Sequence, residues 1–347
     1  MSTVTEARPA TLEATPAGVI IPSALIPIPT RPSLRTIAVR LVGLAALVPF
    51  LLTMPYALKW AGPAYALDFG LVVAMATLSI SVLAWIGEIT LATLAQMGMG
   101  VVGLYFLQQR GVPFALIVPI MVVASVPVSL VIGVFALRLR GVYFAIATLA
   151  FAYLAQKTFF QTYLGGQGGF DQIINRPDYA SDDYRLYYLI MASLLAIAGI
   201  CAVIRRSWIG TRITALRDSE MAFAVLGHSP ARYKLFTVCL AGAIATVAGI
   251  YYGVLQQVVP ANYFSPILSV LYFAYAVVGG FGSIGGAIAA GIVFGTLPKY
   301  FDSLSEGRFV GYDQFFAGFL ALLIVLTTRG GLHEVFGRLR RRIEGTR

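Results

Sequence analysis

The sequence predicts an all-α protein that crosses a membrane about ten times, within a range of roughly eight to eleven spans. Of its 347 residues, 59% are hydrophobic and only 12% are charged, and the mean hydropathy is +0.82. Soluble domains carry about 25% charged residues. Runs such as Ala192–Ile204 and Leu320–Leu326 are continuously apolar, whereas the strands of a membrane barrel alternate apolar and polar residues.

Ten apolar stretches have about the length that a helix needs to cross the hydrocarbon core. Glycine is frequent in the third and the ninth, so we expect some spans to be short or broken. The expected spans are residues 36–57, 66–86, 89–108, 113–137, 141–163, 184–204, 235–257, 263–280, 284–300 and 309–327.

Basic residues cluster on one side of this topology. They lie before span one, between spans four and five, between spans six and seven, and after span ten: Arg31, Arg35, Arg40, Arg138, Arg140, Arg205, Arg206, Arg212, Arg217, Arg232, Lys234, Arg329, Arg338, Arg340, Arg341 and Arg342. Cytoplasmic loops retain such residues, so both termini are expected in the cytoplasm. Basic cytoplasmic loops also explain the net charge of +10. The sequence shows no basic face with aromatic residues beside it, so we do not expect a nucleic-acid partner.

The charge pattern divides the chain into three parts. Residues 1–35 contain five prolines before Thr30 and are expected to be a flexible cytoplasmic arm, residues 36–328 form a transmembrane domain, and residues 329–347 form a basic cytoplasmic tail. Cys201 and Cys239 fall in apolar runs and are expected to be small core residues.

The loop 205–234 concentrates polar residues between two spans and is expected to contain two short helices. In the first helix, Ile213 and Leu216 offer an apolar side over one turn. Asp218 or Ser219 is suited to cap the second helix, which carries its apolar residues at helical spacing. Those residues are Met221, Ala224 and Val225.

Residues after the second short helix predict where it stops and where the next span starts. Gly227 is suited to end the short helix, and Ser229-Pro230 is suited to begin the next one. Such a pair of helices either meets a partner protein or only anchors the bundle at the membrane surface.

Three motifs give this chain a family resemblance. Ala215–Glu220 (ALRDSE), with Leu226-Gly227 and Tyr233-Lys234 after it, resembles the coupling loop of the LivM-type permeases of branched-chain amino acid ABC importers. Leu139–Phe151 (LRGVYFAIATLAF) and Val278–Gly286 (VGGFGSIGG) are similar to two further signatures of that family. The resemblance covers roughly residues 36 to 335.

The resemblance implies a transporter subunit of a bacterial inner membrane rather than an enzyme. It implies as partners two ABC ATPase subunits, a second related permease and a periplasmic substrate-binding protein. No Gly-x-x-x-x-Gly-Lys-Ser/Thr stretch occurs, so we expect ATP to be bound by the partners and no cofactor or metal by this chain. The residues expected to couple to the ATPase are Gly210, Ala215, Leu216, Arg217, Asp218, Glu220 and Gly227.

Further small and polar residues suit either close helix packing or the lining of a solute path. These candidates are Gly98, Gly100, Tyr143, Thr148, Gly279, Gly280, Gly282 and Gly286. An outer loop with four glycines suits either a tight turn or exposed amides near the mouth of the path. Its glycines are Gly165, Gly166, Gly168 and Gly169.

Two alternatives to a branched-chain amino acid importer stay open. Near Gly87 the family carries a histidine that this chain lacks, so the solute is either a small hydrophobic amino acid or urea, an amide or an aromatic acid. An ion-coupled secondary transporter would need ionisable groups inside the bundle. Asp68, Glu88 and Lys157 are candidates, but they lie near span ends, where we expect their charges to reach water.

Overall fold

The computed structural model divides the chain into two units, residues 1–51 and residues 52–347. In the first unit, strand β1 (Leu12–Ala14) pairs antiparallel with β2 (Ile20–Pro22), so that Glu13 lies opposite Ile21. The residues described are 12–14, 20–22, 61–139, 141–163, 174–180, 182–259, 261–304 and 318.

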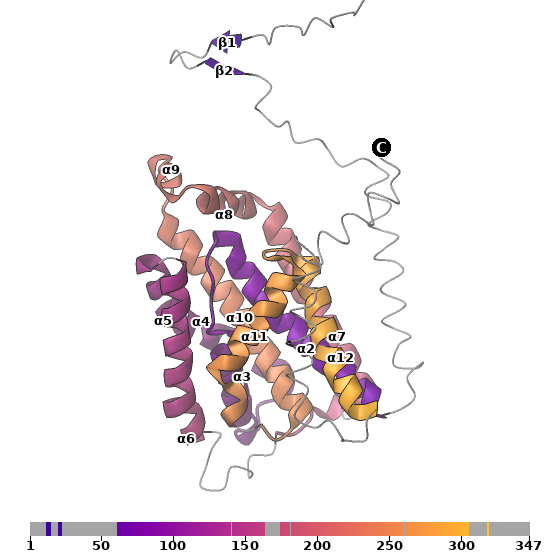
Figure 1. Ribbon diagram of the computed structural model, residues 1–347. Helices are drawn as coiled ribbons and strands as arrows, with labels where there is room; N and C mark the ends of the chain where they lie inside the picture. Colours follow the sequence, from indigo (N-terminus) through magenta and orange to yellow (C-terminus); the bar gives the residue numbers. More distant parts are fainter. Residues whose placement is uncertain are drawn as a thin grey trace, which may run out of the picture. The chain divides into compact units, whose positions relative to one another are not determined.

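The described part of the second unit is helical (Figure 1). Its elements are α2 (Ala61–Leu83), η2 (Ala84–Ile86), α3 (Thr93–Gln109), α4 (Phe114–Arg138), α5 (Val142–Leu154), the π-turn η3 (Ala155–Phe160), α6 (Gln161–Tyr163), η4 (Asp178–Ala180), α7 (Asp183–Arg206), α8 (Trp208–Asp218), α9 (Glu220–Val225), α10 (Pro230–Gln256), η5 (Ala261–Phe264), α11 (Pro266–Gly280) and α12 (Ile284–Leu304).

Each of the eight spans expected between residues 66 and 300 contains a helix in the structure. By length and composition, the described residues contain five helices able to cross a membrane: Tyr65–Ile86, Phe114–Arg138, Val142–Phe160, Asp183–Arg206 and Pro230–Gln256. Pro266–Gly280 and Ile284–Tyr300 are shorter apolar helices. Apart from Gly318, the expected spans 36–57 and 309–327 lie outside the described residues.

The third helix begins later than the sequence predicts. Gly87 has a left-handed backbone with φ of 77° and ends the helical turn that follows α2. Residues 88–92 then form an irregular link, and α3 begins at Thr93 instead of residue 89. The Leu91 amide in this link donates a hydrogen bond to Thr148 Oγ1 at 3.0 Å. The link is therefore held against α5.

Two helices form the centre of the bundle. The apolar stretch of α2 is buried over its whole length, and 83% of that of α10 is buried, whereas α4, α5 and α7 each bury 28%. Ser79 Oγ of α2 donates a hydrogen bond to the Ala241 carbonyl of α10 at 2.8 Å. The outer helices expose apolar side chains such as Val123 and Val203, as expected of surfaces that face lipid.

A seam of small residues joins α2 to α12, which lie side by side in Figure 1. A Cβ atom added at Gly291 would lie 2.3 Å from the Cα atom of Ala74, so a larger residue cannot fit there without movement. Thr77 Oγ1 donates a hydrogen bond across the seam to the Ala287 carbonyl at 2.9 Å. Small residues and hydroxyl groups are the usual means of joining helices in lipid.

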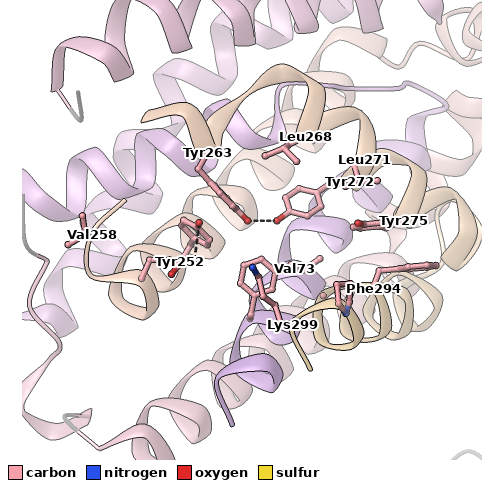
Figure 2. A pocket seen from close by; sticks show the side chains of 14 residues that line it. Val73, Tyr252, Val258, Tyr263, Leu268, Leu271, Tyr272, Tyr275, Phe294 and Lys299 are labelled. Atoms are coloured by element: carbon pink, nitrogen blue, oxygen red, sulfur yellow. Dashed lines mark hydrogen bonds between the residues drawn. The ribbon is translucent and has the colours of Figure 1, made fainter. Parts of the chain in front are cut away.

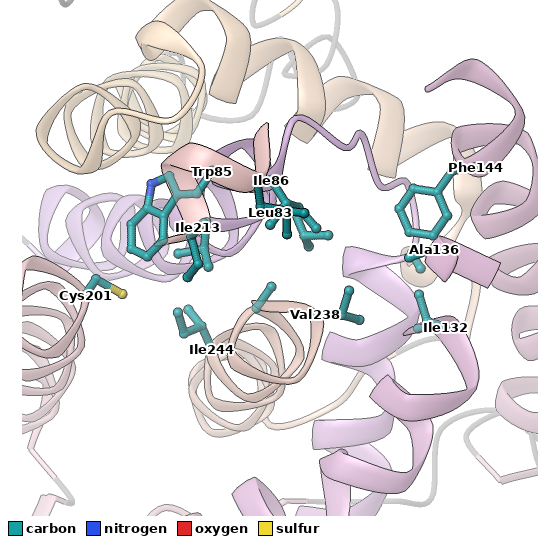
Figure 3. Packing of buried hydrophobic residues seen from close by; sticks show 14 of the residues in the cluster. Leu83, Trp85, Ile86, Ile132, Ala136, Phe144, Cys201, Ile213, Val238 and Ile244 are labelled. Carbon is teal, nitrogen blue, oxygen red and sulfur yellow. The ribbon is translucent and has the colours of Figure 1, made fainter. Parts of the chain in front are cut away.

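A second centre of packing lies where the end of α2 meets the loop helices (Figure 3). Leu83 at the end of α2 and Trp85 of η2 are buried in one cluster with Ile213 of α8, Val238 of α10 and Cys201 of α7. This cluster connects the loop 205–234 to the central helices.

Candidate functional site

The first loop helix, α8, is attached tightly to the end of α7. Ser207 caps it, because Ser207 Oγ accepts a hydrogen bond from the Ile209 amide at 3.3 Å. A Cβ atom added at Gly210 would lie 2.3 Å from the Arg205 carbonyl oxygen. Glycine at this position therefore lets the chain turn directly from one helix into the other.

One side of α8 faces the bundle and the other faces away from it. Ile213 and Leu216 are buried in the cluster described above. Ala215 and Asp218 are exposed on the other side. Arg217 is exposed as well, but it lies beside Gly87 and lines a small cavity with Trp85 and Arg205. The side of α8 that the sequence predicts to be apolar is thus the side that packs.

The second loop helix, α9, begins and ends where its sequence predicts. Of the two possible caps the structure uses Ser219, whose Oγ accepts a hydrogen bond from the Ala222 amide at 3.2 Å. Gly227 follows with φ of 79°, and Ser229-Pro230 begins α10. Phe223 is buried, with its ring centroid 5.4 Å from that of Tyr233.

The apolar side predicted for α9 faces away from the bundle. Met221 is 81% exposed, Val225 is 86% exposed and Leu226 is 74% exposed. We call these three residues the α9 patch. Figure 1 shows α9 at one end of the bundle, next to α8. Exposed apolar residues grouped in this way mark contact sites more often than isolated ones do.

A buried ion cluster ties this loop to the rest of the bundle. Lys234 at the start of α10 is buried, and its Nζ lies 3.0 Å from Glu220 Oε2 of α9 and 3.8 Å from Glu88 Oε1. Glu88 Oε2 in turn accepts a hydrogen bond from the Gly141 amide, next to α5, at 3.0 Å. The Lys234 cluster, formed by Glu88, Lys234 and Glu220, therefore connects α9 to the α2–α3 link and to α5.

A second connection runs from the end of α7 to the turn between α11 and α12. The Gly282 carbonyl accepts hydrogen bonds from Trp85 Nε1 at 3.1 Å and from Arg205 Nη1. The Arg205 guanidinium lies 5.4 Å from the centroid of the Trp85 ring. Gly282 has φ of 86°, which favours glycine.

The sequence reading of the ionisable residues was wrong for Glu88 and Asp68. Both were expected to reach water, yet they are only 5% and 2% exposed. Glu88 is held by Lys234, far away in the sequence, so no local spacing reveals the pair. Asp68 is buried within α2, and its Oδ1 has no hydrogen-bond partner among the described residues. Lys157 is exposed, 5.9 Å from the Tyr153 ring.

Several of the glycine candidates lie at close helix contacts. Cβ atoms added at Gly98 and Gly100 would meet the Phe160 ring and the Thr246 carbonyl at 2.4 and 2.3 Å. Gly279 and Gly286 face each other across α11 and α12, where an added Cβ would lie within 2.4 Å of the partner's carbonyl oxygen.

The remaining candidates differ in their surroundings. Gly280 has φ of 103° in the last residue of α11, Thr148 is fully buried, and Tyr143 is 74% exposed. The predicted outer-loop glycines, Gly165, Gly166, Gly168 and Gly169, lie outside the described residues.

The long apolar helices and their exposed apolar faces are those of a multi-pass membrane protein. Residues 63–326 match the family described as branched-chain amino acid transport system / permease component, and the chain therefore belongs to this family.

Three relatives carry names from the same kind of transport system. One relative is the high-affinity branched-chain amino acid transport system permease protein LivM of Salmonella typhimurium, to which the chain is 26% identical over 250 residues. The matched region covers 64% of this chain and 58% of the relative. LivM of Escherichia coli is 26% identical over 251 residues, with the same coverage. A probable LivH permease of Methanocaldococcus jannaschii is 25% identical over 41% of this chain and 45% of its own length.

The chain thus matches less than two thirds of the length of these LivM relatives. No solved structure matches it.

Proposed function

We propose that this chain is the transmembrane permease subunit of an ATP-driven ABC importer. It works in the bacterial inner membrane with two separate ATPase subunits, a second related permease and a periplasmic binding protein. Its solutes are branched-chain or other small hydrophobic amino acids, with urea, amides or aromatic acids as the alternative within the same family. In the ten-span topology that the sequence predicts, both termini and the loop 205–234 are in the cytoplasm.

The observation that carries this proposal is the two-sided construction of α8 and α9. Their inner sides are fixed to the bundle by Ile213, Leu216 and Phe223, while the α9 patch stays exposed. A short helix that offers apolar residues to a groove is a common mode of protein recognition. The ATPase subunit is the partner we assign to this patch.

The two connections of the loop explain how a push on α9 reaches the spans. A displacement of α9 moves Glu220, and through Lys234 it acts on Glu88 and the α2–α3 link. A displacement of α8 acts through Ile213 on Trp85 and on the end of α2. Because packed interiors transmit displacement rather than absorb it, both routes pass the motion of the loop on to α2 and α10.

The docking step is tested by giving the α9 patch a charge. Met221→Asp and Val225→Asp place a carboxylate in an apolar contact, and each is expected to abolish co-purification of the ATPase with this chain from native membranes. Both residues are exposed, so the amount and the thermal stability of the chain in the membrane should stay unchanged.

Met221→Leu is the matched control, because it keeps an apolar side chain of similar volume and should retain the ATPase. An ATPase that co-purifies equally with the aspartate variants would contradict the docking step. Uptake by this chain alone in lipid vesicles, driven by an ion gradient, would instead support the ion-coupled transporter that the buried carboxyl of Asp68 suggests.

A further inference from the structure

A cavity of about 360 Å³ lies at the end of the bundle opposite to α8 and α9. Tyr252 and Gln256 on its wall belong to the last turn and a half of α10, whereas Lys234 is the fifth residue of that helix. A helix rises about 1.5 Å per residue, so the cavity and the Lys234 cluster are separated by most of the length of a span. In the proposed topology the cavity is on the outer side.

Aromatic rings make up much of the wall of this cavity: Phe69, Tyr252, Tyr263, Tyr272, Tyr275 and Phe294. Figure 2 labels all of them except Phe69. Two pairs of them are stacked. The ring centroids of Tyr252 and Tyr263 are 4.2 Å apart at an angle of 20°, and those of Tyr275 and Phe294 are 4.7 Å apart at 2°. Within each pair the facing sides of the rings cover each other, so the outer faces and the edges are left for a ligand, and these suit a planar aromatic group better than a branched aliphatic one.

Among the described residues that line this cavity, one carries a positive charge. Lys299 of α12 lines the cavity, and its Nζ lies 5.5 Å from the centroid of the Phe69 ring. Figure 2 shows its end directed into the space between Tyr252, Tyr263 and Tyr272. An ammonium group in such surroundings is a natural partner for a carboxylate.

Hydroxyl and amide groups fix the aromatic wall in place. Tyr263 and Tyr272 share a hydrogen bond between their hydroxyl groups at 2.8 Å. Gln256 Nε2 donates to the Tyr252 hydroxyl at 3.1 Å, and Gln256 Oε1 accepts from the Tyr65 hydroxyl at 2.8 Å. A mostly apolar cavity with a few placed polar groups is the usual form of a small-molecule site.

We infer that this cavity binds a small carboxylate that carries an aromatic ring, with Lys299 facing the carboxylate and the tyrosine rings facing the aromatic group. The inference that this cavity binds the solute of an importer rests on the proposed transport function, and it narrows the solute class to aromatic carboxylates. The inference that the cavity binds such a compound at all rests only on its geometry.

Binding is measured on the full chain in lipid nanodiscs, without ATPase or binding protein. The probes are 3-phenylpropionate, phenylalanine, leucine and the neutral alcohol 3-phenylpropanol. We expect saturable binding of the two aromatic carboxylates and weaker binding of leucine. Lys299→Met should weaken the binding of 3-phenylpropionate about ten- to hundredfold, as is typical of a lost charged hydrogen bond. Lys299→Arg should keep most of it.

The alcohol and a second lysine variant are controls that distinguish loss of the Lys299 ammonium group from unfolding of the chain. Binding of 3-phenylpropanol should survive Lys299→Met, and the exposed Lys157→Met should change nothing. The inference is overturned if neither aromatic carboxylate binds, if Lys299→Met leaves their binding unchanged, or if leucine binds as tightly as phenylalanine. Because no ATPase is present, these outcomes are independent of the co-purification test of the α9 patch.

Discussion

Helix α2 is held in two different ways along its length. In its middle, Gly291 and Gly295 of α12 bring that helix within backbone contact of Ala74 and Gly70. At its end, Trp85 and the residues after it are held by side chains: Ile213, Arg205 and the Lys234 cluster. Backbone atoms in direct contact cannot shift past one another without a clash, so α2 and α12 are expected to move together. The side chains at the other end of α2 contact α8 and α9, so motion of the loop 205–234 can enter the bundle there.

The largest expected effect on stability is at the end of α2 that contacts the loop 205–234, where the Lys234 cluster can be broken directly. Lys234→Ala removes the positive charge that faces both Glu88 and Glu220, and such a loss inside a protein costs about 3–5 kcal/mol. Thermal unfolding of the purified chain in detergent measures this loss. Lys157→Ala, at an exposed site, is the control and should change stability by less than about 0.5 kcal/mol. Equal effects of the two variants would mean that the cluster does not hold the loop.

An intermediate effect is expected at the seam. Gly291→Val inserts atoms where a Cβ alone would lie 2.3 Å from Ala74, and overpacking of this kind costs about 1–3 kcal/mol. Gly285→Ala in the same helix has no atom within 4 Å of the added Cβ, so it should be neutral or slightly stabilising. The same unfolding measurement compares them. A stable Gly291→Val protein would contradict the close contact of α2 and α12.

The smallest effect is expected from the cap of α9, and it should be local. Ser219→Ala removes the acceptor for the Ala222 amide, which costs about 1 kcal/mol. Amide hydrogen exchange of residues 220–226 should become faster, while the exchange of α2 and α12 stays unchanged. Ser219→Asp keeps a capping oxygen and should restore protection. Faster exchange throughout the bundle would show that α9 is part of the same rigid unit as the seam.

The sequence predicted local features of the loop better than its contacts. Ser219, Gly227 and Pro230 act through the backbone within a few residues, so their positions are enough to place the ends of α9 and the start of α10. Glu88 was misread because its partners come from α9 and α10, and only the folded chain brings them together. The aromatic cavity was missed for the same reason, since its rings come from four separate helices and η5.

Composition and pattern alone determined that this chain is helical and apolar enough for a membrane, and three short motifs were sufficient to indicate its family. These features are local, because a helix in lipid must satisfy its backbone hydrogen bonds within its own segment. The tertiary structure alone decided which charges are buried, which side of α9 stays exposed and where a cavity remains. Those properties depend on distances between residues that are far apart in the sequence, and neither hydropathy nor residue spacing determines such distances.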